Sequence, residues 1–170
     1  MRAGRGRART SCVAARAVPR DSNPLTRIIR VRTRHTLRQS AIREFICQAI
    51  ETVEYPGTTA EEFYDEIWRR VADNDVGVFL GLEGEVPKAL AIALLPISAT
   101  MMAPQVAIVY NAGPPSLIRA VGKRVKDWIV AGGYDRVMGM NLRHDAGAFA
   151  RGFSYMGRPK MIGAVVEWRF

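Results

Sequence analysis

The sequence predicts an α/β protein with a mixed central sheet flanked by helices, in the order β-α-α-β-β-β-α-β-α-β. First, an apolar run (Gln105–Asn111), an amphipathic helix (Ser116–Ala131) and a second apolar run (Tyr134–Asn141) form a strand, crossover helix and strand, so the two strands should be parallel. Second, residues 76–95 read as two strands joined by a tight turn at Gly84, which predicts an antiparallel hairpin. Third, apolar residues recur with helical spacing ahead of this hairpin.

The N-terminal elements are predicted from changes in the spacing of apolar residues along the chain. Residues Arg27–Thr33 alternate apolar and basic side chains, which is typical of a strand with one buried face. A helical period begins at Thr36 and stops at Tyr55-Pro56-Gly57. A second helix should begin after Thr59, because Glu62 three residues later completes a capping box. The apolar side of the first helix consists of Leu37, Ile42, Phe45, Ile46, Ala49 and Ile50.

The remaining elements complete the sheet. Val76–Leu82 and Lys88–Leu95 are the strands of the hairpin, and the second is rich enough in Ala, Ile and Leu to be buried on both faces. Another helix should follow Asn141, and Met161–Phe170 should form one final strand. We therefore expect two parts in the chain: a basic N-terminal arm, residues 1–24, and one folded domain, residues 25–170.

Composition limits the classes of function. A chain of 170 residues with 48% apolar content can fill one core. The longest apolar stretch, Ala89–Ala103, is interrupted by Pro96, so no membrane span and no membrane partner are expected. Cys12 and Cys47 match no metal-ligand spacing and should be free thiols in a reducing compartment. The sequence therefore indicates a cytoplasmic or virion protein that is not secreted and holds no metal.

The arm carries most of the net charge of +9, because residues 1–20 contain six arginines and no acid. Three interpretations stay open: a solvated tail, an arm that binds an acidic protein or nucleic acid, and a targeting segment. Arginines would give salt-dependent contacts with phosphates, although the arm lacks aromatic residues on which bases could stack. The candidate partner-binding residues are Arg2, Arg5, Arg7, Arg9, Arg16 and Arg20.

The element order and a set of residues in the second half resemble the GNAT superfamily of N-acetyltransferases. The resemblance covers residues 27–170 and depends on an aromatic residue near a helix end, a Gly-Tyr-x-x-Val strand start, an Asn, and a later Gly-Phe pair. More narrowly, the chain resembles the divergent GNAT-like proteins of tailed phages, some of which are virion or assembly proteins. The matching residues are Trp128, Gly133, Tyr134, Val137, Asn141, Gly152 and Phe153.

The resemblance implies a wedge between the fourth and fifth strands that holds acetyl-CoA. Pantetheine would pair with the edge of the strand Val106–Tyr110, with Val109 among its contacts. The pyrophosphate would lie on the loop before the next helix, at Asn111, Gly113, Ser116 and Leu117. A tyrosine of the last helix would protonate the departing thiolate, so that positioning and proton transfer account for much of the catalysis.

Two departures from the family pattern concern the site. The loop reads Asn-Ala-Gly-Pro-Pro-Ser-Leu from Asn111, with one glycine where the family has two small residues, and Pro114 and Pro115 offer no N–H groups. This Gly-Pro-Pro sequence is either a sharp helix start or a weakened anion site that uses the N–H groups of Gly113, Ser116 and Leu117. The family's tyrosine position holds no phenol, and Tyr155 is the one nearby candidate for a catalytic acid.

These departures lead to a main hypothesis and an alternative. The main hypothesis is a noncatalytic structural or binding protein of a larger assembly, such as a phage particle, whose basic arm holds another protein. It needs no cofactor. The alternative is an acetyl-CoA-dependent N-acetyltransferase with a nonstandard pyrophosphate loop. A third interpretation, nucleic-acid binding through the arm, is compatible with the first.

Overall fold

The structure is a computed structural model, and it describes residues 26–54, 57–96, 103–140, 158–162 and 165–170. The predicted helix after Asn141 and the basic arm lie outside these ranges. The elements are β1 (Thr26–Val31), α1 (Arg34–Leu37), α2 (Ser40–Val53), α3 (Ala60–Arg70), the 3-10 helix η1 (Val71–Asp73), β2 (Val76–Glu83), β3 (Val86–Leu94), β4 (Gln105–Asn111), α4 (Pro115–Ala131), β5 (Arg136–Met140), β6 (Arg158–Ile162) and β7 (Val165–Arg169).

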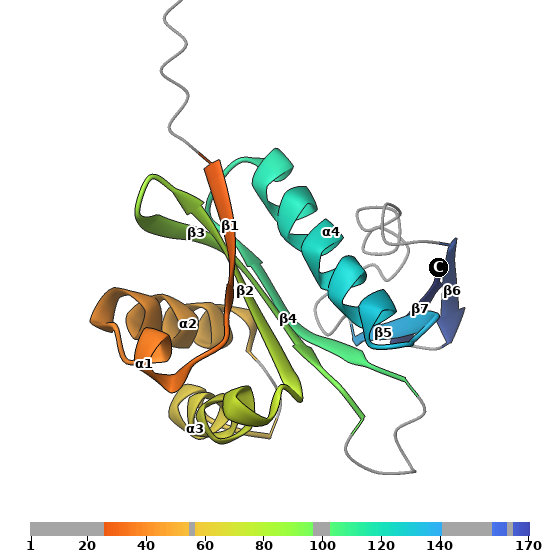
Figure 1. The fold of residues 1–170 in the computed structure, drawn as a ribbon, viewed down its shortest axis with the longest axis horizontal. Helices are drawn as coiled ribbons and strands as arrows, with labels where there is room; N and C mark the ends of the chain where they lie inside the picture. Colours follow the sequence, from red (N-terminus) through yellow and green to blue (C-terminus); the bar gives the residue numbers. More distant parts are fainter. Residues whose placement is uncertain (1–25, 55–56, 97–102, 141–157, 163–164) are drawn as a thin grey trace, which may run out of the picture.

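The strands form one seven-stranded sheet in the order β1-β2-β3-β4-β5-β7-β6 (Figure 1). Neighbouring strands are antiparallel except β4 and β5, which are parallel and joined by α4. The predicted mixed α/β architecture is therefore confirmed. No helix among the described residues has the length and apolar character that a membrane crossing requires.

Helices cover the sheet on opposite faces, with α2 and α3 on one side and α4 on the other (Figure 1). Strand β3 shows why the two sides differ. Its large residues Leu90 and Ile92 pack toward α2 and α3, whereas the alanines between them face α4. Successive side chains of a strand point to opposite faces, so the face of β3 toward α4 carries small side chains and the helix can pack close to the sheet.

The N-terminal helical region differs from the prediction because one expected helix is two. Thr33 caps α1, its hydroxyl accepting a hydrogen bond from the Thr36 N–H at 3.2 Å. Gln39 then has an extended backbone, with φ −60° and ψ 123°, and α2 begins at Ser40. The predicted capping box of α3 is confirmed, since Thr59 and Glu62 bond each other's backbone N–H groups at 2.9 and 3.2 Å.

The C-terminal strand also differs from the prediction. Instead of one strand over Met161–Phe170, the chain forms the antiparallel pair β6 and β7, with Lys160 opposite Glu167. The apolar pattern runs on through this part of the sequence, so the pattern alone does not reveal that two strands are present. Strand β7 lies between β5 and β6, so this hairpin extends the sheet beyond the parallel pair.

Candidate functional site

The sheet splits between its two parallel strands. Among the described residues, strands β4 and β5 pair at two positions, Gln105 with Met138 and Val106 with Gly139. Beyond them, β4 continues to Asn111 while it stays paired with β3 on its other side. In the part of the chain that the structure describes, in which β5 ends at Met140, nothing pairs with β4 after Val106 on this side. Backbone N–H and C=O groups on such an edge are available to an extended ligand.

A β-bulge lies where the two strands separate. Ile92 of β3 pairs with Ile108 of β4, but Ala93 pairs with Val106, so Ala107 has no partner of its own on β3. A bulge bends a strand and increases its twist. The bulge thus gives a local reason for the direction in which β4 leaves β5.

The loop after β4 satisfies most of its own hydrogen-bonding groups. The Asn111 side chain donates to the Gly113 carbonyl at 2.9 Å and accepts from the Gly113 N–H at 3.3 Å. The Ala112 N–H donates to the Lys88 carbonyl at 2.7 Å, and the Leu117 N–H to the Pro114 carbonyl at 3.0 Å. These N–H groups are engaged within the protein.

Helix α4 begins at this loop with Pro114 as its N-cap and Pro115 as its first residue. Pro115 brings a φ that suits the first turn, and its missing N–H is one that the helix would leave unsatisfied. Ser116 follows and is exposed, and its N–H has no partner among the described residues. An anion at the start of α4 would therefore meet one free N–H group and the positive end of the helix dipole.

The predicted cofactor-binding residues do lie together, at the open end of the wedge. Val109 is half-buried on β4, Asn111 ends that strand, and Gly113 and Ser116 follow in the loop and the first turn of α4. Leu117 differs from the others because its side chain is 1% exposed and belongs to the core under α4. Tyr155 and the six arginines of the arm lie outside the described residues.

The structure adds Lys88, which sequence reasoning missed. Its neighbour Ala89 pairs with Asn111, so Lys88 lies beside the loop on the adjacent strand. A Cβ atom placed on Gly113 would be 3.1 Å from the Lys88 Cβ atom and 3.1 Å from Leu117 Cδ2. The pairing of β3 with β4 creates this proximity, and no local motif around Lys88 indicates it.

The residues that carried the family resemblance have structural roles where they are described. Trp128 packs against Phe79 with a ring separation of 5.8 Å, and Val137 is fully buried. Gly133 has a φ of +85°, which favours glycine and ends α4 sharply. Asn141, Gly152 and Phe153 lie outside the described residues.

Other polar groups in the described ranges have structural roles. No group of three or more His, Cys, Asp or Glu side chains that could hold a metal ion occurs in the part of the chain that the structure describes. Burial raises the pKa of the Cys47 thiol and of the Tyr64 phenol. Tyr64 donates a 2.7 Å hydrogen bond to the Leu37 carbonyl, so it joins α3 to α1. The wedge and its loop are therefore the candidate site.

A sheet that splits between its fourth and fifth strands, with a helix starting at the mouth of the split, is the arrangement that the resemblance to the GNAT fold predicts. Solved structures agree with this fold. No protein-family model matches the sequence, and no curated protein matches it.

Three similar structures illustrate the likeness. A protein of Desulfovibrio desulfuricans assigned to the GNAT acetyltransferase family has a TM-score of 0.61 at 14% identity, covering 85% of this chain and 99% of its own. The PaiA N-acetyltransferase of Thermoplasma acidophilum, in complex with coenzyme A, has a TM-score of 0.55 at 12% identity and covers 85% and 99%. YncA of Salmonella typhimurium, assigned as an acetyltransferase and solved with its cofactor acetyl-CoA, has a TM-score of 0.63 at 11% identity. The match covers 85% of this chain and 93% of YncA.

These likenesses establish the fold: the chain has the GNAT fold over most of its length. The narrower resemblance to tailed-phage proteins stays a prediction.

Proposed function

We propose that the chain is an acetyl-CoA-dependent N-acyltransferase. The observation that carries the proposal is the split between β4 and β5 after two paired positions in the part of the chain that the structure describes, with the bulge at Ala107 at its apex. Structures of the same fold hold coenzyme A or acetyl-CoA. This supports the alternative that the sequence left open better than it supports a noncatalytic assembly role.

The uncovered edge of β4 suits the pantetheine arm. Pantetheine contains two amide groups, and an extended amide chain can pair with free backbone groups as an added strand would. Among the described residues, nothing pairs with residues 107–110 of β4 on the side that faces away from β3, so they offer such groups there. Val109, half-buried on this strand, would line the groove.

The loop supplies fewer phosphate contacts than the family pattern predicts. The Ser116 N–H group has no partner among the described residues and the α4 dipole points at the same place, whereas the N–H groups of Gly113 and Leu117 are engaged. Lys88 adds a cation beside the loop. We therefore assign pyrophosphate binding to Ser116, Lys88 and the start of α4.

Acetyl-CoA, when bound, supplies a thioester whose acyl carbon an amine can attack. The C–N bond forms, the C–S bond breaks, the amine loses a proton and the thiolate accepts one. The protein's part is to fix the groove so that the acyl group lies near the apex of the wedge, at the bulge residue Ala107, which follows the paired residue Val106. Holding the two reactants in one geometry lowers the entropy cost of the step.

The test is calorimetric titration of acetyl-CoA into the full chain, followed by measurement of thiol release over a panel of primary amines. We expect micromolar binding and amine-dependent thiol release. Lys88→Met should weaken binding about tenfold, because a charged contact with a phosphate contributes roughly 1.5–3 kcal/mol. Lys123→Met, which changes an exposed lysine of α4, is the matched control and should leave affinity unchanged.

Two results would overturn the proposal. One is the absence of binding at millimolar acetyl-CoA by a protein whose circular dichroism shows it folded. The other is tight binding without thiol release for any amine, which would leave a cofactor-binding module with no transfer activity.

A further inference from the structure

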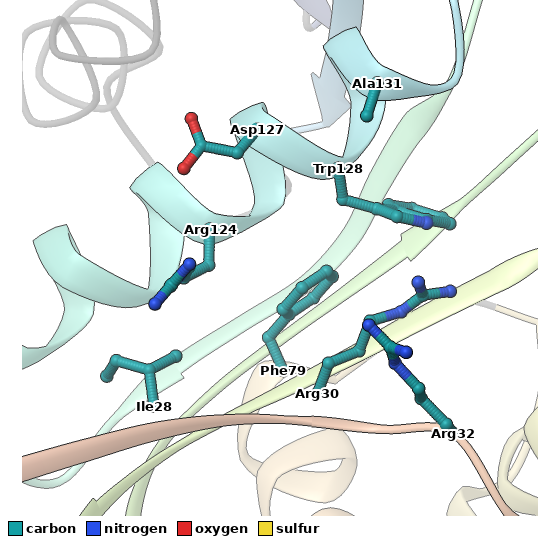
Figure 2. A pocket seen from close by; sticks show the side chains of 8 residues that line it. All are labelled: Ile28, Arg30, Arg32, Phe79, Arg124, Asp127, Trp128 and Ala131. Atoms are coloured by element: carbon teal, nitrogen blue, oxygen red, sulfur yellow. The ribbon is translucent and has the colours of Figure 1, made fainter.

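A second cavity lies on the opposite side of α4 from the wedge, between that helix and the edge strand β1. Its volume is about 450 Å³. Figure 2 shows the side chains of Arg30 and Arg32, from the end of β1, and of Arg124, from α4, around the same space. Trp128 forms part of its wall, and Asp127 lies on α4 at its rim.

The backbone explains why three arginines meet there. Arg30 lies on β1 and Arg32 directly after that strand ends, and both line the cavity between β1 and α4. Residues four apart share a face of a helix, which places Arg124 and Trp128 on the side of α4 that faces β1. Because β1 is the edge of the sheet, this space is open on its outer side.

The positive charge of this cavity is not neutralised by the described residues. Arg32 and Arg124 are exposed and form no ion pair within the described part of the chain. Arg30 donates to the Asn74 side chain, but its Nε–H is buried without a partner. Burial, and next the charge of Arg32, lower the pKa of Arg30. The described lining of this cavity thus holds three guanidinium groups and one carboxylate, that of Asp127 at the rim.

Arg30 is fixed in place by aromatic rings. Its guanidinium carbon lies 4.8 Å from the centre of the Trp128 ring and 5.9 Å from that of Phe79. Such stacking holds a guanidinium in one orientation and leaves its edge free to bind an anion. The rings also give the cavity an apolar wall, which a ligand with a hydrocarbon or aromatic body could cover.

We propose that this cavity binds a small phosphate monoester with an apolar or aromatic body. Guanidinium groups match the oxygens of a phosphate in two-point hydrogen bonds. A phosphate monoester carries a charge of roughly −1.5 to −2 at neutral pH. That charge balances the surplus of two positive charges from Arg30, Arg32 and Arg124 over Asp127. The site is separate from the acetyl-CoA groove, because α4 lies between them.

The probe is phenyl phosphate, titrated calorimetrically into the full chain at low salt. We expect saturable binding that Arg32→Gln and Arg124→Gln each weaken about tenfold, as the loss of one charged hydrogen bond predicts. Both arginines are exposed, so these variants should fold. Asp127→Asn should strengthen binding about twofold by removing the one negative charge. Lys123→Gln, one residue from Arg124, is the matched control and should bind as the unaltered chain does.

Several outcomes would overturn the proposal. The first is no saturable binding by the unaltered chain. A second is equal weakening in Lys123→Gln, which would mean a response to overall charge. A third is equal affinity for phthalate, a dicarboxylate of similar size, which would remove the preference for phosphate. A fourth is competition between phenyl phosphate and acetyl-CoA, which would place the anion in the other groove.

Discussion

Two glycines of β2 determine how close α4 can lie to the sheet. A Cβ atom on Gly77 would come 2.6 Å from Phe79 Cε2 and 2.7 Å from Trp128 Cζ3. A Cβ atom on Gly81 would come 2.7 Å from Leu117 Cδ1. Neither glycine has a positive φ, so their role is to leave space. Because neither glycine has a side chain, Trp128 and Leu117 can pack against β2. Trp128 lines the proposed phosphate cavity, and Leu117 lies next to the proposed acetyl-CoA groove.

Replacing Gly77 by Ala should therefore destabilise the protein by about 1–3 kcal/mol, the usual cost of forcing an extra carbon into a packed core. The added methyl group would push against the Trp128 ring. Urea unfolding monitored by circular dichroism measures the free energy of unfolding. Lys123→Ala is the control: it changes an exposed residue of α4 and should leave the free energy of unfolding within about 0.5 kcal/mol of the unaltered chain. Equal stability of Gly77→Ala and the unaltered chain would mean that the ring can move aside freely.

At the scale of elements, the start of α3 is stabilised both by a capping box and by hydrogen bonds between side chains. Thr59 and Glu62 exchange hydrogen bonds with each other's backbone, and Glu62 also accepts from the Thr59 and Thr58 hydroxyls at 3.0 and 3.3 Å. These bonds lower the pKa of Glu62, with the Thr59 backbone N–H as the largest cause. The ionised carboxylate is therefore the form that the folded state favours.

A pH dependence follows. Because the folded-state pKa of Glu62 is below its unfolded value, its contribution to stability is present above the unfolded pKa and disappears as the pH falls through the folded pKa. Glu62→Gln should thus lower the free energy of unfolding, measured by urea titration, more at pH 7 than at pH 3. In a Thr59→Ala background this pH-dependent difference should shrink. If Glu62→Gln changed the free energy of unfolding equally at both pH values, the assignment would be contradicted.

Regular elements could be predicted from the sequence where local pattern and tertiary packing agree. The capping box at Thr59, the turn at Gly84 and the strand–helix–strand unit around α4 are confirmed because turn chemistry and apolar spacing specify them locally. The break at Gln39 was missed because apolar spacing continues across it. The final hairpin was missed because two short extended runs look like one.

The candidate site could be predicted only in part. Its place at the end of β4 follows from the order of elements. The sequence does not predict that the Gly113 and Leu117 N–H groups are hydrogen-bonded to Asn111 and Pro114. Those bonds depend on side-chain and turn geometry. Lys88 and the arginine-lined cavity arise from pairing and packing between segments far apart in the chain, and no sequence motif marks them.

For the whole molecule, the narrow junction between β4 and β5 divides the sheet. Strands β1 to β4 are paired along most of their lengths, as are β5, β7 and β6, but within the described ranges the two groups share two paired positions. Cooperative opening follows the density of such contacts. We therefore expect the hydrogen bonds among β5, β7 and β6 to open while those among β1 to β4 stay intact.

Hydrogen exchange tests this. Amides of β5 and β7 should exchange faster than those of β2 and β3 in the free protein, and acetyl-CoA should slow β5 more than β2, because a ligand in the wedge links the two groups. Pulsed exchange read by mass spectrometry resolves the segments. Uniform exchange across all strands would show that the sheet opens as one unit.

The open edge of β4 also bears on how such a protein can change over evolutionary time. A groove made of peptide N–H and C=O groups is present whatever side chains occupy the strand, provided the strand keeps its path. A substitution along this strand then has to preserve little besides the size of the side chain. A lineage can therefore lose most of the residues that its relatives share and still preserve the groove. This fits a chain that keeps the fold of acetyltransferases at 11–14% identity while matching no family model.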